Sequence, residues 1–152
     1  IDTSRYDFHR GDIRNTVPPM NFTSLPFTDA SVDVMVLDPP YQHGQHPQFD
    51  KTYRTASCGD IEDVVAKFYR PGMVEAWRVL RPGGRLMVKC QNEVTQAKRQ
   101  RWTVWEIKEV AEQLGFYARD QFTLVRKINP HIPYQRQHHA RRNESVLWVF
   151  VK

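Results

Sequence analysis

The sequence predicts an α/β protein built on a mostly parallel sheet, and three observations support this class. Short apolar runs typical of strands alternate with segments whose apolar residues recur at helical spacing. Turns that contain glycine or proline separate these segments. The last two predicted strands, at 121–127 and 145–152, have only a polar segment between them, so we expect them to pair antiparallel as a terminal hairpin.

Two strands are predicted in the first part of the chain. A short strand occupies 5–12, and the turn-rich segment 22–33 leads into a second strand that runs from Val32 to Asp38. A polar loop, rich in His, Gln, Thr and Ser, follows at 42–59. The second strand looks buried, because it contains the apolar run from Val34 to Leu37.

A helix is predicted after this loop. Asp60 suits the N-cap position, and Val64, Val65 and Phe68 follow it at helical spacing. Pro71 either kinks this helix or separates it from a second helical piece, because proline lacks an N–H and clashes with the preceding turn.

A turn, a strand and a last helix complete the elements between residues 81 and 115. The stretch "RPGG" at 81–84 reads as the turn and "RLMVKC" at 85–90 as the strand. The last helix carries one apolar stripe and is closed by Gly115 as its C-terminal cap. The stripe consists of Val104, Ile107, Val110, Ala111 and Leu114.

Length and composition limit the classes of protein that need to be considered. A chain of 152 residues, 40% apolar, is long enough for one domain with a real core. No apolar run approaches 18 residues and the first twelve residues lack a secretory pattern, so we expect a cytoplasmic protein without a membrane partner. Cys58 and Cys90 are too few for a disulfide framework and form no CxxC pair, so no metal site is expected.

The net charge of +5 is concentrated in the C-terminal third. Between Val94 and Asn143 the chain has ten Lys or Arg against four Asp or Glu. Arg, His and Gln are interleaved there with aromatic residues, which suits contacts to phosphates and stacking on bases. This pattern favours a nucleic-acid partner, and the alternative is a solvated basic face.

The second strand ends in "DPPY", residues 38–41, where a carboxylate, two prolines and an aromatic ring follow the apolar run. A strand cap and a rigid turn would account for these residue types. In open α/β sheets, however, ligands bind beyond the carboxyl ends of the strands. Other polar residues fall at predicted strand ends too, namely Asp2, Asp12 and the group 89–92. Their clustering favours a ligand site.

The strand ending in "DPPY", followed by "EAWRVLRPGGRLMVK" at 75–89, resembles the S-adenosylmethionine-dependent amino-methyltransferases of DNA. The resemblance runs from about Ile1 to the C-terminus and includes "KCQNEV" and "QRQHHARRNESVLWVF". It implies a Rossmann-like class I methyltransferase fold, S-adenosylmethionine as cofactor and DNA as partner. The reaction it implies is site-specific methylation of the exocyclic amino group of adenine (N6) or cytosine (N4).

The resemblance assigns the base side of the active site to residues 38–41. The exocyclic amine is a poor nucleophile because its lone pair is delocalised into the ring. Asp38 and the backbone carbonyl of Pro39 would accept its hydrogens and free the lone pair for in-line attack. Pro39 and Pro40 fix φ and remove competing N–H donors, and Tyr41 would stack on the flipped base.

The resemblance also implies cofactor contacts. Asp2 matches the acidic residue that holds the ribose hydroxyls, and Asp12 matches the one that meets the adenine amino group, with Ile13 beside it as an apolar wall. Asp38 would border the cofactor as well. Asp2 and Asp12 can equally be ordinary loop aspartates.

The chain departs from the family pattern at its start. The strand and glycine-rich turn that approach the methionine end of the cofactor are expected before Ile1 and are not in the sequence. We therefore interpret residues 1–152 as a single, partial methyltransferase domain that lacks one or more N-terminal strands. We expect this polypeptide alone to bind the cofactor weakly or not at all.

Two loops, 42–59 and 128–143, are expected to contact nucleic acid. Two alternatives to a DNA methyltransferase stay open: an RNA amino-methyltransferase acting on adenine N6 or guanine N2, and a non-catalytic nucleic-acid-binding subunit. The loop residues expected to contact nucleic acid are His43, Lys51, Arg54, Arg136, His138, Arg141 and Arg142.

Replacing Arg141 and Arg142 together with Ala is expected to weaken DNA binding and flatten its salt dependence. Each lost phosphate contact should reduce the slope of log K against log salt by about 0.9. Fluorescence anisotropy titrations of duplex DNA at several salt concentrations measure both quantities. An unchanged slope would remove this loop from the predicted interface.

Overall fold

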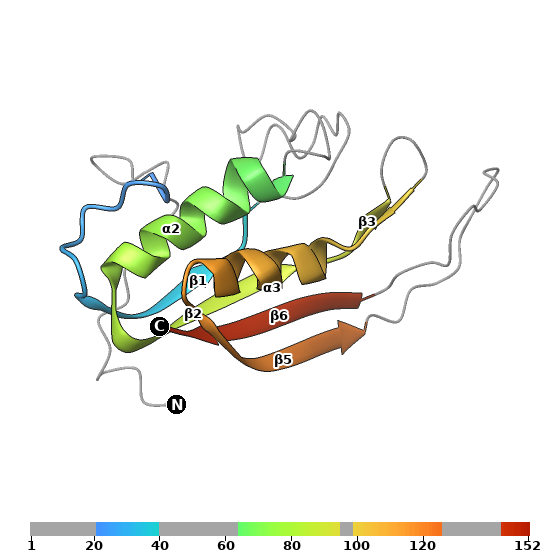
Figure 1. Ribbon diagram of the computed structural model, residues 1–152. Helices are drawn as coiled ribbons and strands as arrows, with labels where there is room; N and C mark the ends of the chain where they lie inside the picture. The colour runs from blue at the N-terminus through green and yellow to red at the C-terminus, as the bar shows by residue number, and fades with distance from the viewer. Residues whose placement is uncertain (1–20, 40–63, 95–98, 126–143) are drawn as a thin grey trace.

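The computed structural model describes residues 21–39, 64–94, 99–125 and 144–152. They form a four-stranded mixed sheet in the order β1-β2-β6-β5, with two α-helices on one of its faces (Figure 1). β1 pairs with β2 in parallel, whereas β6 pairs antiparallel with both β2 and β5. The strands are β1 (Val32–Leu37), β2 (Leu80–Cys90), β5 (Tyr117–Val125) and β6 (Glu144–Val151).

The predicted α/β class and the antiparallel C-terminal hairpin are both confirmed. The sheet is mixed because β6, the last strand of the chain, inserts between β2 and β5. Within the four-stranded sheet of the described residues there are one parallel pairing and two antiparallel ones. A two-stranded ladder of β3 (Glu93–Val94) and β4 (Gln100–Arg101) was not predicted, because two-residue strands leave no periodic pattern.

The "RPGG" stretch forms a bulge inside β2. Val32 pairs with Leu80 and Val34 with Arg85, so two residues of β1 span five residues of β2. Gly83 has φ +77°, and a Cβ at Gly84 would lie 2.8 Å from the backbone oxygen of Arg81. Glycine is therefore required by the backbone here, and the turn predicted from the sequence appears as an interruption within one strand.

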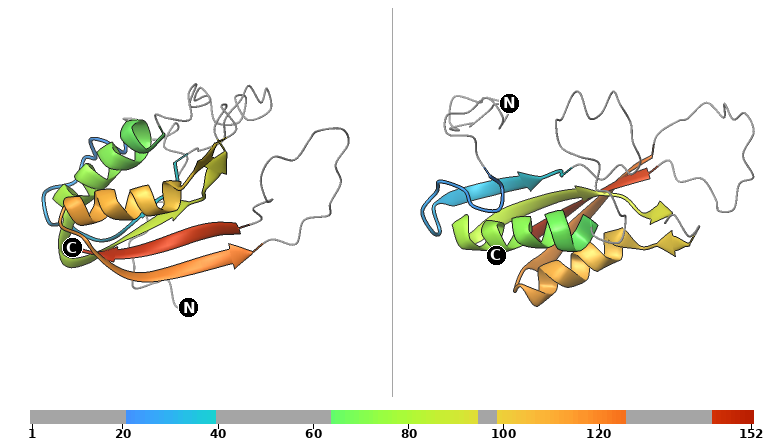
Figure 2. Two further views of the ribbon diagram at one scale, coloured as in Figure 1. Left: turned by 45° about the vertical axis from the view of Figure 1, so that its right-hand side comes forward. Right: turned by 90° about the horizontal axis from the view of Figure 1, so that it is seen from above.

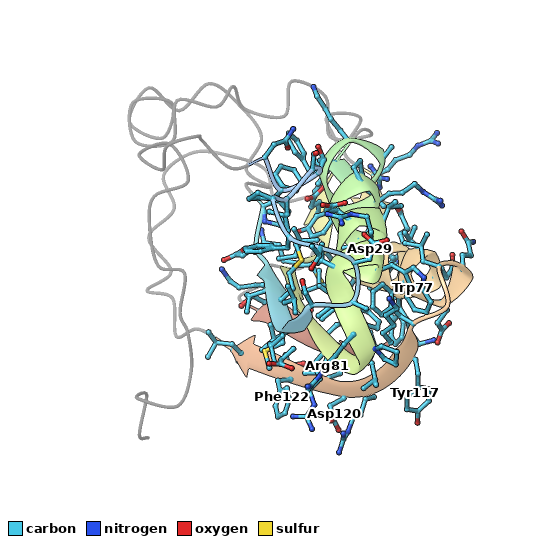
Figure 3. The ribbon with its side chains drawn as sticks, turned by 90° about the vertical axis from the view of Figure 1, so that its left-hand side faces the viewer. Asp29, Trp77, Arg81, Tyr117, Asp120 and Phe122 are labelled. Carbon is cyan, nitrogen blue, oxygen red and sulfur yellow. The ribbon has the colours of Figure 1, made fainter. Side chains whose placement is uncertain are left out.

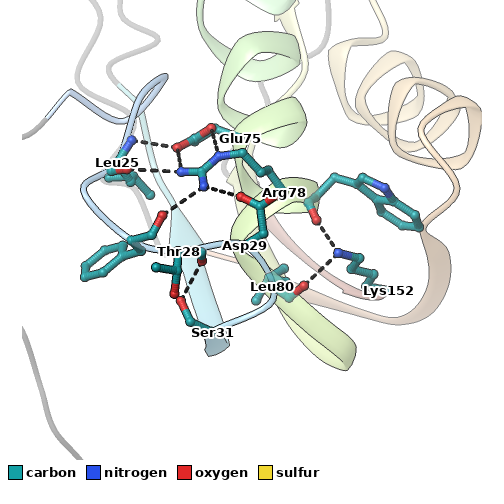
Figure 4. A network of polar contacts seen from close by, with 10 residues as sticks. Leu25, Thr28, Asp29, Ser31, Glu75, Arg78, Leu80 and Lys152 are labelled. Carbon is teal, nitrogen blue, oxygen red and sulfur yellow. Dashed lines mark hydrogen bonds and ion pairs between the residues drawn. The ribbon is translucent and has the colours of Figure 1, made fainter.

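The C-terminal residue closes this bulge. The backbone N–H of Gly83 donates to the Lys152 carbonyl at 2.9 Å, and the Lys152 N–H donates to the Gly84 carbonyl at 3.0 Å. The ammonium of Lys152 also donates to the backbone oxygen of Leu80 at 2.7 Å (Figure 4). The bulge is thus held from the side of β6, and its shape sets the register of β2 against β1.

The helix around Pro71 changes type without a break. A π-helical turn, η2 (Val65–Tyr69), ends with the Arg70 N–H donating to the Val65 carbonyl, and α2 (Arg70–Val79) starts at the next residue. Pro71 is the second residue of α2 and has no N–H to donate to the π-helical turn that precedes it. The sequence correctly marked Pro71 as a division, but the helix continues through it.

The last helix, α3 (Thr103–Gln113), follows the predicted stripe, and its end was predicted correctly. The N–H of Phe116 donates to the Ala111 carbonyl and that of Gly115 to the Glu112 carbonyl, both at 3.0 Å. With φ +101° at Gly115, this is a Schellman cap. Phe116 then buries its ring edge-on against Trp77, at 4.8 Å between centroids.

The core lies between the helices and one face of the sheet. α2 packs on β1 and β2, and α3 packs on β5 and β6; both helices lie on the same side in every view (Figures 1 and 2). Alternate strand residues point into this core. The strand residues buried in this core are Leu37, Leu80, Leu86, Val88, Cys90, Val146, Trp148 and Phe150.

The opposite face of the sheet is apolar and exposed within the described part of the chain. Val34 and Val36 of β1 are 48% and 63% exposed, and Phe122 and Leu124 of β5 are 59% and 58% exposed. Figure 3 shows Phe122 and its neighbour Asp120 projecting from β5 away from the helices. Neither α2 nor α3 covers this face.

A polar network attaches the segment before β1 to α2. Arg78 donates to the carboxylate of Asp29 at 2.6 Å, to that of Glu75 at 2.6 Å, and to the carbonyls of Leu25 and Phe27 (Figure 4). The hydrogen bond from Arg78 lowers the pKa of the buried Glu75 carboxyl. The segment is thereby anchored where it enters β1.

Several predicted elements lie outside the described residues. They are the strand at 5–12, the loop at 42–59, the N-cap Asp60 and the loop at 128–143. Among the helices that the structure describes, none has the length and apolar character needed to cross a bilayer.

Gly115→Ala is expected to destabilise the fold more than Gly83→Ala. Both positions have positive φ, which costs an alanine about 1–2 kcal/mol. At Gly115 the new Cβ would also lie 2.8 Å from the Trp77 ring, whereas at Gly83 nothing lies within 4 Å. The clash should add about 1–3 kcal/mol to the loss in free energy of unfolding, which urea titration measures. Equal losses at the two positions would contradict this.

Candidate active site

Asp38 follows β1 directly, at the edge where β1 and β2 both end. Its neighbours Leu37 and Pro39 are buried, whereas Asp38 itself is exposed. Leu37 packs closely on α2, because a Cβ at Gly72 would lie 3.0 Å from a methyl carbon of Leu37. The carboxylate therefore stands at the surface on a backbone that is anchored on both sides.

The register of the parallel pair brings Lys89 beside Asp38. Leu37 pairs with Val88, so the next residues along the two strands are neighbours. The ammonium of Lys89 donates to Oδ2 of Asp38 at 2.8 Å. With side chains 33% and 43% exposed, this ion pair stabilises the fold by about 0.2–1 kcal/mol at most. Its main effect is to orient the carboxylate.

Tyr69 contacts the end of β2 from the helical side of the sheet. Its side chain is fully buried at the end of the π-helical turn η2, and its hydroxyl donates to the backbone oxygen of Lys89 at 3.0 Å. π-helical turns are rare and occur frequently at functional sites. Here the turn places a buried hydroxyl against the residue that pairs with Asp38.

Cys90, the last residue of β2, is buried and behaves as a small core residue. Burial raises the pKa of its thiol to about 12, with further contributions from the negative charges of Asp38 and Glu93. A thiol with this pKa is protonated at neutral pH, so Cys90 is not a nucleophile.

Asn92 and Glu93 connect the end of β2 to α3. Oδ1 of Asn92 accepts the Val104 N–H at 3.2 Å and so caps α3, whose N-cap residue Trp102 makes no side-chain cap bond. Glu93 is buried and begins the β3–β4 ladder. Of the polar group 89–92, Asn92 therefore has a structural role, and Lys89 is the member that reaches Asp38.

Among the predicted site residues, the structure describes Asp38 and Pro39. It places Asp38 at the expected edge of the sheet and Pro39 in the core beside it. The roles assigned to Asp38, Pro39 and the remaining site residues all stay predictions, and the remaining residues lie outside the described parts. They are Asp2, Asp12, Ile13, Pro40, Tyr41, His43, Lys51, Arg54, Arg136, His138, Arg141 and Arg142.

Tyr69 and the pairing of Lys89 were missed from the sequence. Tyr69 sits in a stretch that reads as an apolar helix face, which gives no sign that its hydroxyl matters. Lys89 was recognised only as a polar residue at a strand end. Its position opposite Asp38 depends on the β1–β2 register and on the bulge at 81–84, which the sequence does not show. In the described segments no group of three His, Cys, Asp or Glu residues could hold a metal.

Comparisons with solved structures match the fold of this chain to that of methyltransferases. A candidate DNA modification methylase from Thermus thermophilus, complexed with S-adenosyl-L-methionine, has a TM-score of 0.57 at 24% identity. The match covers 84% of this chain and 50% of that one. A second structure of the same protein has a TM-score of 0.56 at 20% identity and covers 93% of this chain and 52% of that one.

The cytosine-N4-specific PvuII DNA methyltransferase has a TM-score of 0.50 at 14% identity, covering 83% of this chain and 44% of that one. The chain has an α/β fold like that of class I S-adenosylmethionine-dependent methyltransferases. It spans about half the length of these solved structures. No protein-family model and no curated protein matches the sequence.

The raised pKa of Cys90 predicts how stability changes at alkaline pH. In the unfolded chain the thiol titrates near 9.0, while in the folded protein it stays protonated to about 12. Above pH 9 the unfolded state therefore binds fewer protons, and the free energy of unfolding should fall as pH rises towards 12.

Urea unfolding of a Cys58→Ser variant between about pH 8 and 10.5 measures this fall. The same variant with Cys90→Ala should show a shallower pH dependence, since the titrating thiol is gone. Ready reaction of the native Cys90 thiol with an alkylating reagent at about pH 8 would contradict the assignment.

Proposed function

We propose that this chain carries the base-binding side of the active site of a DNA amino-methyltransferase, acting on adenine N6 or cytosine N4. The observation that carries the proposal is the position of Asp38. It is an exposed carboxylate between two buried neighbours, at the carboxyl edge of a sheet that resembles those of methyltransferases. Its place in "DPPY" and the basic C-terminal third support the same assignment.

The geometry suits an acceptor for an amine. An oxygen of Asp38 accepts one N–H of the target amine, and the backbone carbonyl of Pro39 accepts the other. This draws the nitrogen lone pair out of the ring. The lone pair then forms the N–C bond, the bond from carbon to sulfur breaks with its electron pair going to sulfur, and the nitrogen afterwards releases one proton.

S-adenosylmethionine would supply an electrophilic methyl group on a positively charged sulfur. Among the described residues, the partly exposed carboxylate of Asp38 fits this cofactor, because a negative charge suits a position beside the positively charged sulfur. Asp2, Asp12 and Ile13 are the residues proposed to hold its ribose and adenine. Asp38 acts here through positioning and electrostatics, with the acceptors in place before the base arrives.

We further propose that residues 1–152 form a partial catalytic domain, because the chain spans about half the length of the methyltransferases it matches. The loops at 42–59 and 128–143 are proposed to contact the DNA backbone. The assay accordingly uses the full-length protein that contains this chain. Transfer of labelled methyl groups to duplex DNA, transfer RNA and ribosomal RNA is compared, and the methylated nucleoside is identified by mass spectrometry.

Asp38→Ala is expected to lower kcat for methyl transfer by about 10²–10³-fold, since it removes a preorganised acceptor. The dissociation constant for S-adenosylmethionine, measured by calorimetry, should change little. Asp33→Ala is the matched control, because Asp33 lies at the other end of β1 and also forms an exposed ion pair, with Arg81 at 2.7 Å.

Equal effects of Asp38→Ala and Asp33→Ala would reject Asp38 as the acceptor. Methylation of RNA but not DNA would replace DNA by RNA as the substrate. Absence of methyl transfer to all three nucleic acids would reject the proposed function.

A further inference from the structure

We propose that Lys89 is a positioning residue, which orients the carboxylate of Asp38 so that one oxygen faces the target amine. This inference rests on the proposed methyl transfer and deepens it. It starts from one contact, the 2.8 Å hydrogen bond from the Lys89 ammonium to Oδ2 of Asp38. Among the described residues, no other hydrogen bond to the Asp38 side chain is formed, so Oδ1 is the oxygen left for the amine.

Orientation matters because the terminal torsion of an aspartate is soft. The two carboxylate oxygens can rotate over a broad range unless a neighbour holds one of them. An acceptor that must draw a lone pair out of an aromatic ring needs one oxygen at a fixed place before the substrate arrives. The ammonium of Lys89 supplies that constraint for Asp38.

The backbone of Lys89 is fixed by its own interactions, in addition to the ion pair that its side chain forms. Its backbone pairs with Leu147 of β6, and its carbonyl accepts the buried Tyr69 hydroxyl at 3.0 Å. The β1–β2 register places it one residue beyond the Val88–Leu37 pair. The same two strands carry a second ion pair, between Arg81 and Asp33, whose side chains are 62% and 65% exposed. The side chains of Lys89 and Asp38 are 33% and 43% exposed, so their ion pair is the more shielded of the two.

The chemistry of an ammonium limits what Lys89 can do. A protonated lysine has three donors and no acceptor, so it does not receive the proton that the amine releases. Its positive charge would also repel a methyl donor that is itself cationic, and pairing with Asp38 neutralises that charge. Lys89 therefore acts through Asp38 and does not need to contact the substrate.

The test compares Lys89→Met and Lys89→Arg in the full-length protein. Lys89→Met keeps the length of the side chain and removes the charge and the donors, and is expected to lower kcat about tenfold. The KM for DNA and the dissociation constant for S-adenosylmethionine should stay within about twofold. Lys89→Arg, which keeps both charge and donors, should recover most of the rate. Lys108→Met removes a lysine from another ion pair, with Glu112, and should leave kcat unchanged.

A double-mutant cycle separates positioning from a general structural effect. In an Asp38→Ala background, Lys89→Met should cause no further loss in single-turnover rate, because its effect passes through the missing carboxylate. A full additional tenfold loss there would overturn the proposal, as would equal loss with Lys89→Met and Lys89→Arg. The proposal would also be overturned if Lys89→Met lowered the midpoint of urea unfolding so far that the loss of folded protein explained the loss of rate.

The outcomes also distinguish this inference from the proposed function. If Asp38→Ala abolishes methyl transfer and Lys89→Met leaves kcat unchanged, the function stands and the positioning role is wrong. If the parent protein transfers no methyl group to any nucleic acid, the proposed function fails and the role of Lys89 in it is rejected with it.

Discussion

The register of the parallel pair β1–β2 is the constraint on which the candidate site depends. Side chains alternate between the faces of a sheet, so a slip of one residue would turn Leu37 out of the core and carry Asp38 away from Lys89. The bulge at 81–84 takes up the surplus residues of β2. Lys152 closes that bulge, and the close contact between Leu37 and Gly72 locks the strand against α2.

Charged side chains surround the buried Cys90 thiol at this edge of the sheet. The pKa of the Cys90 thiol is raised chiefly by burial and further by the negative charges of Asp38 and Glu93. Lys89 supplies a positive charge next to the more exposed of the two carboxylates. Cys90 remains neutral, so the core beneath the site carries no thiolate that would compete for a methyl group.

The sequence was sufficient for the elements whose patterns are local. Periodicity located β1, α3 and β6 to within a residue or two at most ends, and Gly115 marked the cap of α3. β5 begins at Tyr117, four residues before the predicted strand, because its first residues carry charges that obscure the alternation. The insertion of β6 between β2 and β5 could not be predicted, since strand order depends on packing between distant segments.

The same distinction between local patterns and distant contacts applies to the candidate site. "DPPY" identified Asp38 as a candidate, but the Lys89 pairing and the Tyr69 hydrogen bond join residues 51 and 20 positions apart in the chain. Such contacts appear only when the register, the bulge and the π-helical turn are all known.

The route of the chain between the two site strands has a consequence for folding. β5 and β6 are consecutive in the chain and form a hairpin, whereas β1 meets β2 only after the connection from Leu37 to Leu80 that contains α2, and β2 meets β6 only after a connection that contains α3. Closing either of these connections costs more chain entropy than closing the hairpin, so we expect the β1–β2 ladder to form after the β5–β6 hairpin. Asp38 and Lys89 therefore come together after the hairpin has formed, and a partly folded chain would present the carboxylate without its partner.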